Sequence, residues 1–216
     1  MSFNCKPEKM PGTIKGNPMT GLCERACIQV DKVFDACVKQ FTGQDSEITL
    51  TDIVPSELTA PFKFISAASI GLEAKVNNLV VSPLPDNSGC ARVTCTVDIP
   101  INVVFIDATG KQGVGKAVIS VPRDIVMHVP SESVIPYNIV ADATVISTSG
   151  RYISGDTRPV FSITYCATVI MKVIMKVQLL VPSYGYAYLP PCTEYTQDVC
   201  DGLFDLPIYP NDCSCN

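Results

Sequence analysis

The sequence predicts an all-β protein, a jelly-roll-like β-sandwich flanked by two cysteine-rich arms. Short runs rich in Val, Ile, Thr and Phe recur from residue 48 to residue 181, and Pro, Gly and Asn separate them. This is the pattern of many short strands joined by turns. Within this region no stretch of about 10 to 15 residues has helical periodicity. The 216 residues are 47% hydrophobic, which is enough for a sizeable buried core.

The chain divides into three predicted segments. These are an N-terminal cysteine-rich arm or connector at 1–43, a β-sandwich domain at 44–182, and an acidic arm rich in Tyr and Cys at 183–216. The predicted strands all lie in the middle segment and end at turn-forming residues. They are 47–53, 62–72, 73–82, 90–97, 101–107, 114–121, 124–129, 135–147, 159–166 and 167–181.

The end of the first segment has two interpretations. Its apolar positions are spaced by 4, 3, 4, 3 and 4 residues, at Cys23, Cys27, Val30, Phe34, Cys37 and Phe41. This spacing predicts one stripe of a short amphipathic helix that ends at 42–47. The alternative is a strand, because 27–38 contains many residues with high β propensity.

Charge and hydropathy exclude several classes of function. With 16 basic and 21 acidic residues the net charge is -5, which argues against a nucleic-acid partner. The longest uncharged apolar stretch, 159–171, is shorter than the roughly 20 residues of a membrane-spanning helix. The N-terminus lacks the apolar run of a signal peptide. We therefore expect no membrane insertion, and synthesis in the cytosol.

No motif supports catalysis or cofactor binding. The segment GKQGVGKA at 110–117 has the spacing of a phosphate-binding loop, but Ala117 stands where Ser or Thr binds Mg²⁺. A β-branched run follows it rather than a helix, so a glycine-rich hairpin loop is predicted. His128 is the only histidine, and no nucleophile motif accompanies it. We expect no enzyme activity, no catalytic residue, no resident metal and no cofactor.

The eleven cysteines are the most informative residues. Because the number is odd, a fully oxidised chain leaves one thiol free or bridges to another copy. Two cysteines, Cys95 and Cys166, fit the interior register of their predicted strands and are expected to be buried. Eight others lie in the arms and are the candidates for disulfides between subunits: Cys5, Cys23, Cys27, Cys37, Cys192, Cys200, Cys213 and Cys215.

A zinc site is the alternative use of the arm cysteines. Structural zinc sites are built from closely spaced cysteine pairs. Such pairs occur at Cys23 and Cys27 and at Cys213 and Cys215. In this interpretation the protein is a zinc-stabilised cytosolic binding module, with its arms held by the metal.

The stretch CERACIQVDKVFDAC at 23–37, followed by β-rich sequence and a CSC tail at 213–215, resembles the cysteine-rich spore coat and spore-surface proteins of endospore-forming bacteria. The resemblance implies a structural protein made in the mother-cell cytoplasm without a signal peptide. It implies assembly with copies of itself, and with other spore-surface proteins, into a layer or fibre of the coat, exosporium or appendages. Relatives in spore appendages are jelly-roll subunits locked by N-terminal cysteines, which points to Cys5, Cys23, Cys27 and Cys37 as cross-linking positions.

Overall fold

The computed structural model describes residues 16–85, 89–155 and 157–187. They fall into two compact units, with boundaries between Val30 and Asp31 and between Lys176 and Val177. All regular structure in the described ranges is β-strand. The prediction of an all-β fold is therefore confirmed, while the jelly-roll arrangement in particular stays a prediction.

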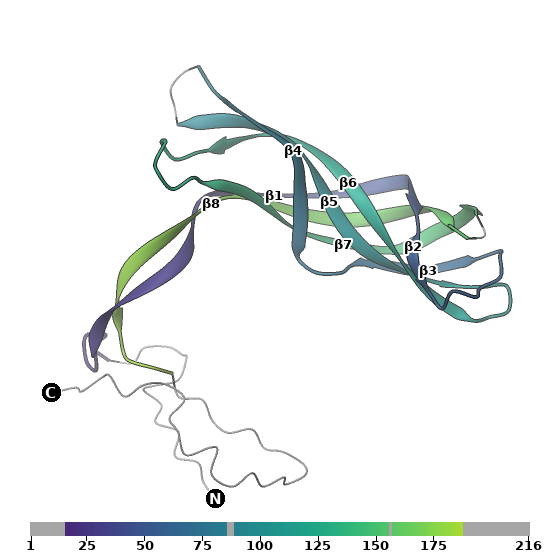
Figure 1. The fold of residues 1–216 in the computed structure, drawn as a ribbon, viewed down its shortest axis with the longest axis horizontal. Helices are drawn as coiled ribbons and strands as arrows, with labels where there is room; N and C mark the ends of the chain where they lie inside the picture. The colour runs from purple at the N-terminus through teal and green to yellow at the C-terminus, as the bar shows by residue number, and fades with distance from the viewer. Residues whose placement is uncertain (1–15, 86–88, 156, 188–216) are drawn as a thin grey trace, which may run out of the picture. The chain divides into compact units, whose positions relative to one another are not determined.

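The strands form one antiparallel sheet (Figure 1), in the order β1-β8-β7-β3-β5-β6-β2. β4 lies off this path and pairs with β5 and β7. β5 and β6 lie side by side from Cys90↔His128 to Ile106↔Gln112. The strands are β1 (Glu24–Thr49), β2 (Thr51–Val54), β3 (Lys63–Ser69), β4 (Glu73–Pro83), β5 (Cys90–Ile106), β6 (Gln112–His128), β7 (Asn138–Ser154) and β8 (Val160–Ser183).

The region expected to hold either a helix or a strand is the strand β1, so the helix prediction is wrong. Within the larger unit, the side-chain amide of Gln40 donates to the Thr168 hydroxyl of β8 at 3.3 Å. Within the smaller unit, the main-chain N–H of Cys23 donates to Ser183 O at 2.9 Å. A 4-3-4 apolar spacing changes face along a strand, so it does not itself predict β1. Pairing with β8 and the β-branched side chains of the segment favour the strand instead. The expected stop at 42–47 is absent, because β1 continues to Thr49.

The sheet closes on itself at one end of the larger unit. β1 and β2 stand at opposite ends of the strand order, yet only Leu50 separates them in the chain. Leu50 is fully buried, and its N–H donates to Pro159 O at 2.9 Å. A single core cluster fills the inner face, where Phe105 lies 5.2 Å from Phe62 and 5.7 Å from Phe161 between ring centroids. The two outer strands thus cover each other at this end, although no strand ladder joins them in the described ranges.

Two strands are longer than predicted because they continue through proline. The predicted breaks at 98–100 and 122–123 are wrong: β5 includes Pro100 and β6 includes Pro122. Pro100 O accepts the N–H of Ile70, which lies between β3 and β4. Because the N–H and C=O of a residue in an antiparallel strand point to the same side, the N–H that Pro100 lacks would also face this gap in pairing. The backbone nitrogen of Pro122 points to the same edge of β6 as that of His128. At this edge the N–H of His128 donates to a side chain and not to the main chain of a neighbouring strand. Proline is tolerated at such edge positions.

β3 and β4 act as two halves of one strand between β5 and β7. Ala67 of β3 pairs with Val103 of β5 and Ser147 of β7. Ala74 of β4 pairs with Ala141 of β7, and Lys75 pairs with Asp98 of β5. Residues 70–72 between them interrupt the ladder and absorb the change in register.

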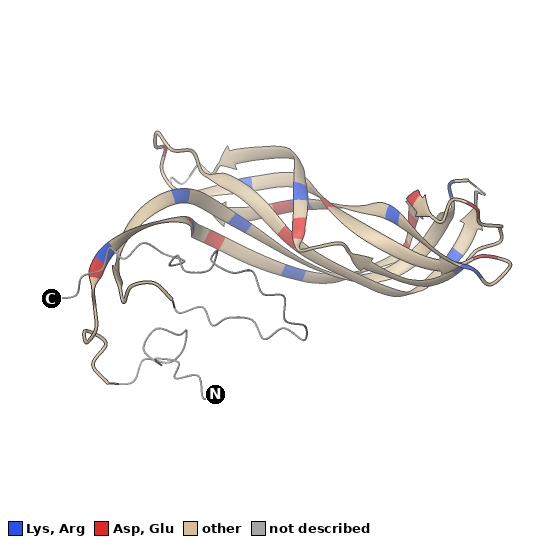
Figure 2. Ribbon diagram, turned by 60° about the horizontal axis from the view of Figure 1, so that its bottom comes forward, with Lys and Arg blue, Asp and Glu red and all other residues tan. Residues whose placement is uncertain are grey.

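Charged side chains are sparse along the strands (Figure 2), in keeping with a charged content of only 17%. Arg92 and Asp124 form an ion pair between β5 and β6 at 2.5 Å, with both side chains more than half exposed. Such exposed pairs contribute little to stability. No helix in the described ranges is long and apolar enough to cross a membrane.

Candidate functional site

Only the start of the predicted glycine-rich hairpin loop at 110–117 is a turn: residues 107–111 connect β5 to β6, and 112–117, with Gly113 and Gly115, are strand. β5 and β6 pair in continuous register on both sides of it, from Ile106↔Gln112 onward. The carboxylate of Asp107 organises the turn by accepting the Thr109 hydroxyl and the N–H groups of Thr109, Lys111 and Thr59. These hydrogen bonds, the Thr109 hydroxyl foremost, lower the pKa of Asp107 to about 2. The loop is a structural turn with its amides already occupied.

The structure places three of the eight candidate cross-linking cysteines. In the smaller unit Cys23 is half-buried and Cys27 is exposed, and in the larger unit Cys37 is exposed on β1. No disulfide joins any two of the six cysteines in the described ranges. The other five candidates lie outside the described residues: Cys5, Cys192, Cys200, Cys213 and Cys215.

The zinc interpretation stays a prediction. Two of its four proposed ligands, Cys213 and Cys215, lie outside the described residues. Among the residues that are described, no group of three or more His, Cys, Asp or Glu side chains is arranged to hold a metal ion.

Of the two cysteines expected in the core, one is buried and one is not. Cys95 is 6% exposed, which confirms the prediction. Cys166 is exposed, so the prediction was wrong. The reason is that β8 is one continuous strand whose odd-numbered residues, Tyr165 and Ala167 among them, face the core. Cys166 therefore points to the outer face, opposite Ile146 of β7.

The larger unit has a stretch where strand pairing is replaced by side-chain contacts. β2 pairs with β6 only at Val114 and Lys116. From Val118 to His128, β6 has β5 as its only strand neighbour in the described part of the chain. Side chains of β1 reach this edge, and we call this stretch the seam. At one end of the seam, the N–H of His128 donates to the Asp35 carboxylate at 2.7 Å.

A buried arginine lies in the seam. Arg123 of β6 is only 9% exposed, and Cys95 is its register partner on β5. Its guanidinium carbon lies 4.9 Å from the ring centroid of Phe41 on β1, a cation–π contact. Its Nη2 atom is fully buried and has no hydrogen-bond partner among the described residues. Burial lowers the pKa of Arg123, since it disfavours the charged form.

Aromatic and thiol groups surround this guanidinium. Phe41 makes an edge contact with Tyr165 of β8, with ring centroids 6.3 Å apart. Cys37, Cys95 and Tyr165 are the groups whose ionisation acts electrostatically on Arg123. Burial raises the pKa of the Cys95 thiol, and the charge of Arg123 offsets part of that rise. The Arg123 cation therefore lies next to an aromatic ring and a thiol, and neither of them is a carboxylate.

Sequence reasoning missed this arginine, although a signal was present. In β6 the inward positions are Val121, Arg123 and Ile125, so strict alternation places Arg123 on the core side. A charged residue in a core register is the kind of exception that marks a site.

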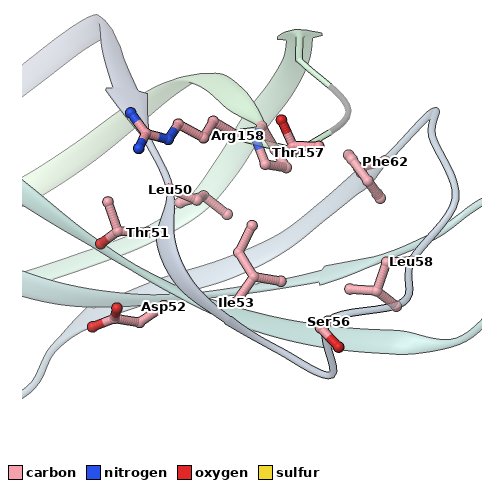
Figure 3. Close-up of a pocket in the computed structure, with 10 residues that line it drawn as sticks. Leu50, Thr51, Asp52, Ile53, Ser56, Leu58, Phe62, Thr157 and Arg158 are labelled. Atoms are coloured by element: carbon pink, nitrogen blue, oxygen red, sulfur yellow. The ribbon is translucent and has the colours of Figure 1, made fainter.

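An open hollow lies near the end of the sheet at which β1 and β2 are joined, and its lining is largely apolar (Figure 3). Its volume is about 610 Å³, and Leu50, Ile53, Leu58 and Phe62 line it. Leu50 and Ile53 point toward its middle, and Arg158 lies at its margin. Among the described residues that line this hollow there is no paired acid and base, and no nucleophile beside a base.

Comparison with known proteins gave no relatives. No protein-family model, no curated protein and no solved structure matches this chain.

Proposed function

We propose that the protein is a structural subunit, without catalytic activity, that assembles with copies of itself into a layer or fibre on the surface of a bacterial spore. Disulfides between cysteine-rich segments of neighbouring copies then make the assembly covalent. The observation that carries this proposal is the exposure of two thiols, Cys27 and Cys37, on the 26-residue strand β1. β8 is the only strand neighbour of β1 in the described part of the chain.

An exposed thiol such as Cys27, on a strand with one strand neighbour in the described ranges, is well placed to meet another chain. Main-chain groups at a strand edge can pair with a further strand, which orients two copies before any bond forms. Two thiols then lose two protons and two electrons, and dissolved oxygen accepts them to give hydrogen peroxide. The result is one S–S bond between copies.

Charge favours the same contact. Residues 1–43 have a net charge of +2 and residues 177–216 a net charge of -5. Opposite charges on the two ends of the chain attract each other between copies and help to fix their relative orientation. A contact between different surfaces does not close on itself, so it extends into a filament or layer.

Mixing two isotope forms of the protein tests the proposal. Unlabelled and ¹⁵N-labelled chains are purified in reductant, mixed, and freed of reductant in air. Non-reducing gels should show a ladder of covalent oligomers, and mass spectrometry should find peptides that join one labelled and one unlabelled chain through Cys27 or Cys37. Electron microscopy of the same sample should show extended assemblies.

Matched variants make the test specific. Replacing both Cys27 and Cys37 by Ser should shorten the ladder, whereas Cys166→Ser, which removes an exposed thiol of the larger unit, should not. A monomer that persists without reductant contradicts the proposal. Equal shortening of the oligomer ladder in both variants contradicts it as well. One equivalent of zinc bound to unreacted thiols would instead support the zinc-stabilised binding module.

A further inference from the structure

We propose that Arg123 is the centre of a binding site for a small monovalent anion such as chloride, held inside the larger unit at the seam. This site is independent of the proposed assembly, because it requires only one copy of the chain. Three features of the seam lead to it: the charge of the guanidinium, its vacant hydrogen-bonding atom, and the absence of pairing between β1 and β6.

The first feature is a charge that no carboxylate of the described residues neutralises in an ion pair. A buried guanidinium is costly unless it is paired with an anion and hydrogen-bonded. On the two strands of the seam, Asp124 accepts from Arg92 at 2.7 Å, and Asp35 accepts from His128. The cation–π contact with Phe41 offsets part of the cost but does not neutralise the charge.

The second feature is the atom that has nothing to bond. Nη2 of Arg123 has no hydrogen-bond partner in the described part of the chain, and it is fully shielded by protein. Buried polar atoms of native proteins nearly always have a partner. A water molecule would satisfy this hydrogen bond but leave the net charge, whereas an anion satisfies both.

The surrounding side chains favour a small anion of single charge. The thiol of Cys95, on the register partner of Arg123, is buried and kept protonated by that burial, so it can donate a weak S–H hydrogen bond. Tyr165, whose ring packs against Phe41 with centroids 6.3 Å apart, carries a hydroxyl donor on the side chain next to the cation–π pair. One guanidinium balances one negative charge, and a dianion such as sulfate would leave a charge buried.

The third feature is a route of entry. Across the seam, β1 meets β6 through side chains such as Asp35 and Phe41 rather than through a ladder of main-chain hydrogen bonds. Local opening therefore breaks few interactions and admits an ion from solvent. On β1 itself, Phe41, which covers the guanidinium, is only partly buried, so the seam lies close to the surface.

Chloride NMR measures this binding directly. The line width of ³⁵Cl should increase when the full-length protein is added in reductant, and iodide should reverse the broadening by competition. The thermal midpoint should be higher in chloride than in gluconate at equal ionic strength, because an ion that binds only the folded state stabilises it.

The variants separate a site from general salt effects. Arg123→Gln should abolish the excess broadening and the preference for chloride. Arg151→Gln changes the charge by the same amount at an exposed arginine of β7, and it should leave both unchanged. Tyr165→Phe removes only one hydroxyl and serves as a milder test if Arg123→Gln does not fold; it should weaken chloride binding several-fold. Equal broadening in the wild type and Arg123→Gln, or no difference between chloride and gluconate for the wild type, would overturn the proposal.

Discussion

The main-chain N–H of His128, at the end of β6, donates a hydrogen bond of 2.7 Å to the side-chain carboxylate of Asp35 on β1. The other oxygen of the same carboxylate accepts the N–H of Ala36 at 2.8 Å. One side chain thus takes the place of a strand partner at the point where β6 has none. This bond and the contact of Arg123 with Phe41 are the two connections that define the seam.

Replacing Asp35 by Ala should loosen this end of the seam. We expect a loss of about 1 to 2 kcal/mol, because two hydrogen bonds to a charged acceptor disappear. The free energy of local opening at the His128 amide should fall by the same amount, so hydrogen exchange there should become faster. Asp35→Asn, which keeps an acceptor oxygen, should recover part of the loss. Asp52→Ala removes only an exposed ion pair with Lys116 and should change stability little, by about 0 to 1 kcal/mol. An unchanged exchange rate at His128 in Asp35→Ala would contradict this role.

The Asp107 turn makes stability depend on pH in the acid range. Its pKa is about 2 in the folded protein, lower than the ordinary 3.8, mainly because the Thr109 hydroxyl bonds the carboxylate. The folded state therefore binds this proton less readily than the unfolded chain does. The stabilisation is complete above about pH 4 and is lost as the pH falls toward 2.

Acid titration of unfolding checks this prediction. The midpoint of denaturant unfolding of the wild type should fall between pH 4 and pH 2. Asp107→Asn should be less stable than the wild type at neutral pH, and it should lose less over this acid range. Thr109→Val removes the largest cause of the shift and should give an intermediate pH dependence. Parallel acid profiles for the wild type and Asp107→Asn would rule out this contribution.

Gly43 allows Tyr165 to lie against β1. A Cβ atom at Gly43 would stand 2.3 Å from Cζ of Tyr165, far inside normal contact. Gly43→Ala should therefore destabilise the protein by about 1 to 3 kcal/mol, as overpacking typically does. Gly71→Ala has no atom within 4 Å of the added Cβ and serves as the control. Thermal unfolding measures both, and similar midpoints for the two variants would contradict the packing. Combining Gly43→Ala with Tyr165→Leu should recover part of the loss.

Phe105 is the centre of the aromatic core. It is fully buried and contacts Phe62 and Phe161. Phe105→Ala should lower the free energy of unfolding by about 3 to 5 kcal/mol, since it leaves a cavity among aromatic rings. Val118→Ala, at a residue that is 55% exposed on β6, should change it by less than about 0.5 kcal/mol. Equilibrium urea unfolding compares the two, and a loss at Phe105 below 1 kcal/mol would place this ring outside the cooperative core.

Local alternation predicted much of the fold. The period of two over 169–181 predicts that the odd-numbered side chains face the core. Val169, Met171, Val173 and Met175 are buried, whereas Leu179 is 42% exposed. Cys95 was placed correctly in the same way. Such predictions succeed because the face on which a strand residue lies depends on its own run of sequence.

Predictions failed where a distant partner decides the outcome. Pro100 and Pro122 were expected to end strands, but each faces a side of its strand where no ladder hydrogen bond is needed. The error at Cys166 is of another kind, because alternation with Phe161, Ile163 and Tyr165 in its own run already puts it on the outer face. The helix expected in the first segment is a strand because β8 pairs with it. None of these partners is close in sequence.

The seam was the least predictable feature. Alternation alone puts Arg123 inward, but Phe41, which covers it, lies on the first strand of the sheet. Their meeting follows from closure of the sheet, which brings β1 toward the free edge of β6. A sequence pattern does not contain this information, because closure depends on all the intervening strands.

The antiparallel pairing of β1 with β8 determines how the larger unit bears mechanical load. The chain enters this unit at Asp31 and leaves it at Lys176, on adjacent strands that run in opposite directions, so both connections lie at the same end of the sheet. Tension that draws these two points apart separates β1 from β8 one hydrogen bond at a time. Tension that pulls both points in the same direction loads the two long strands in parallel, so it does not peel one strand from the other.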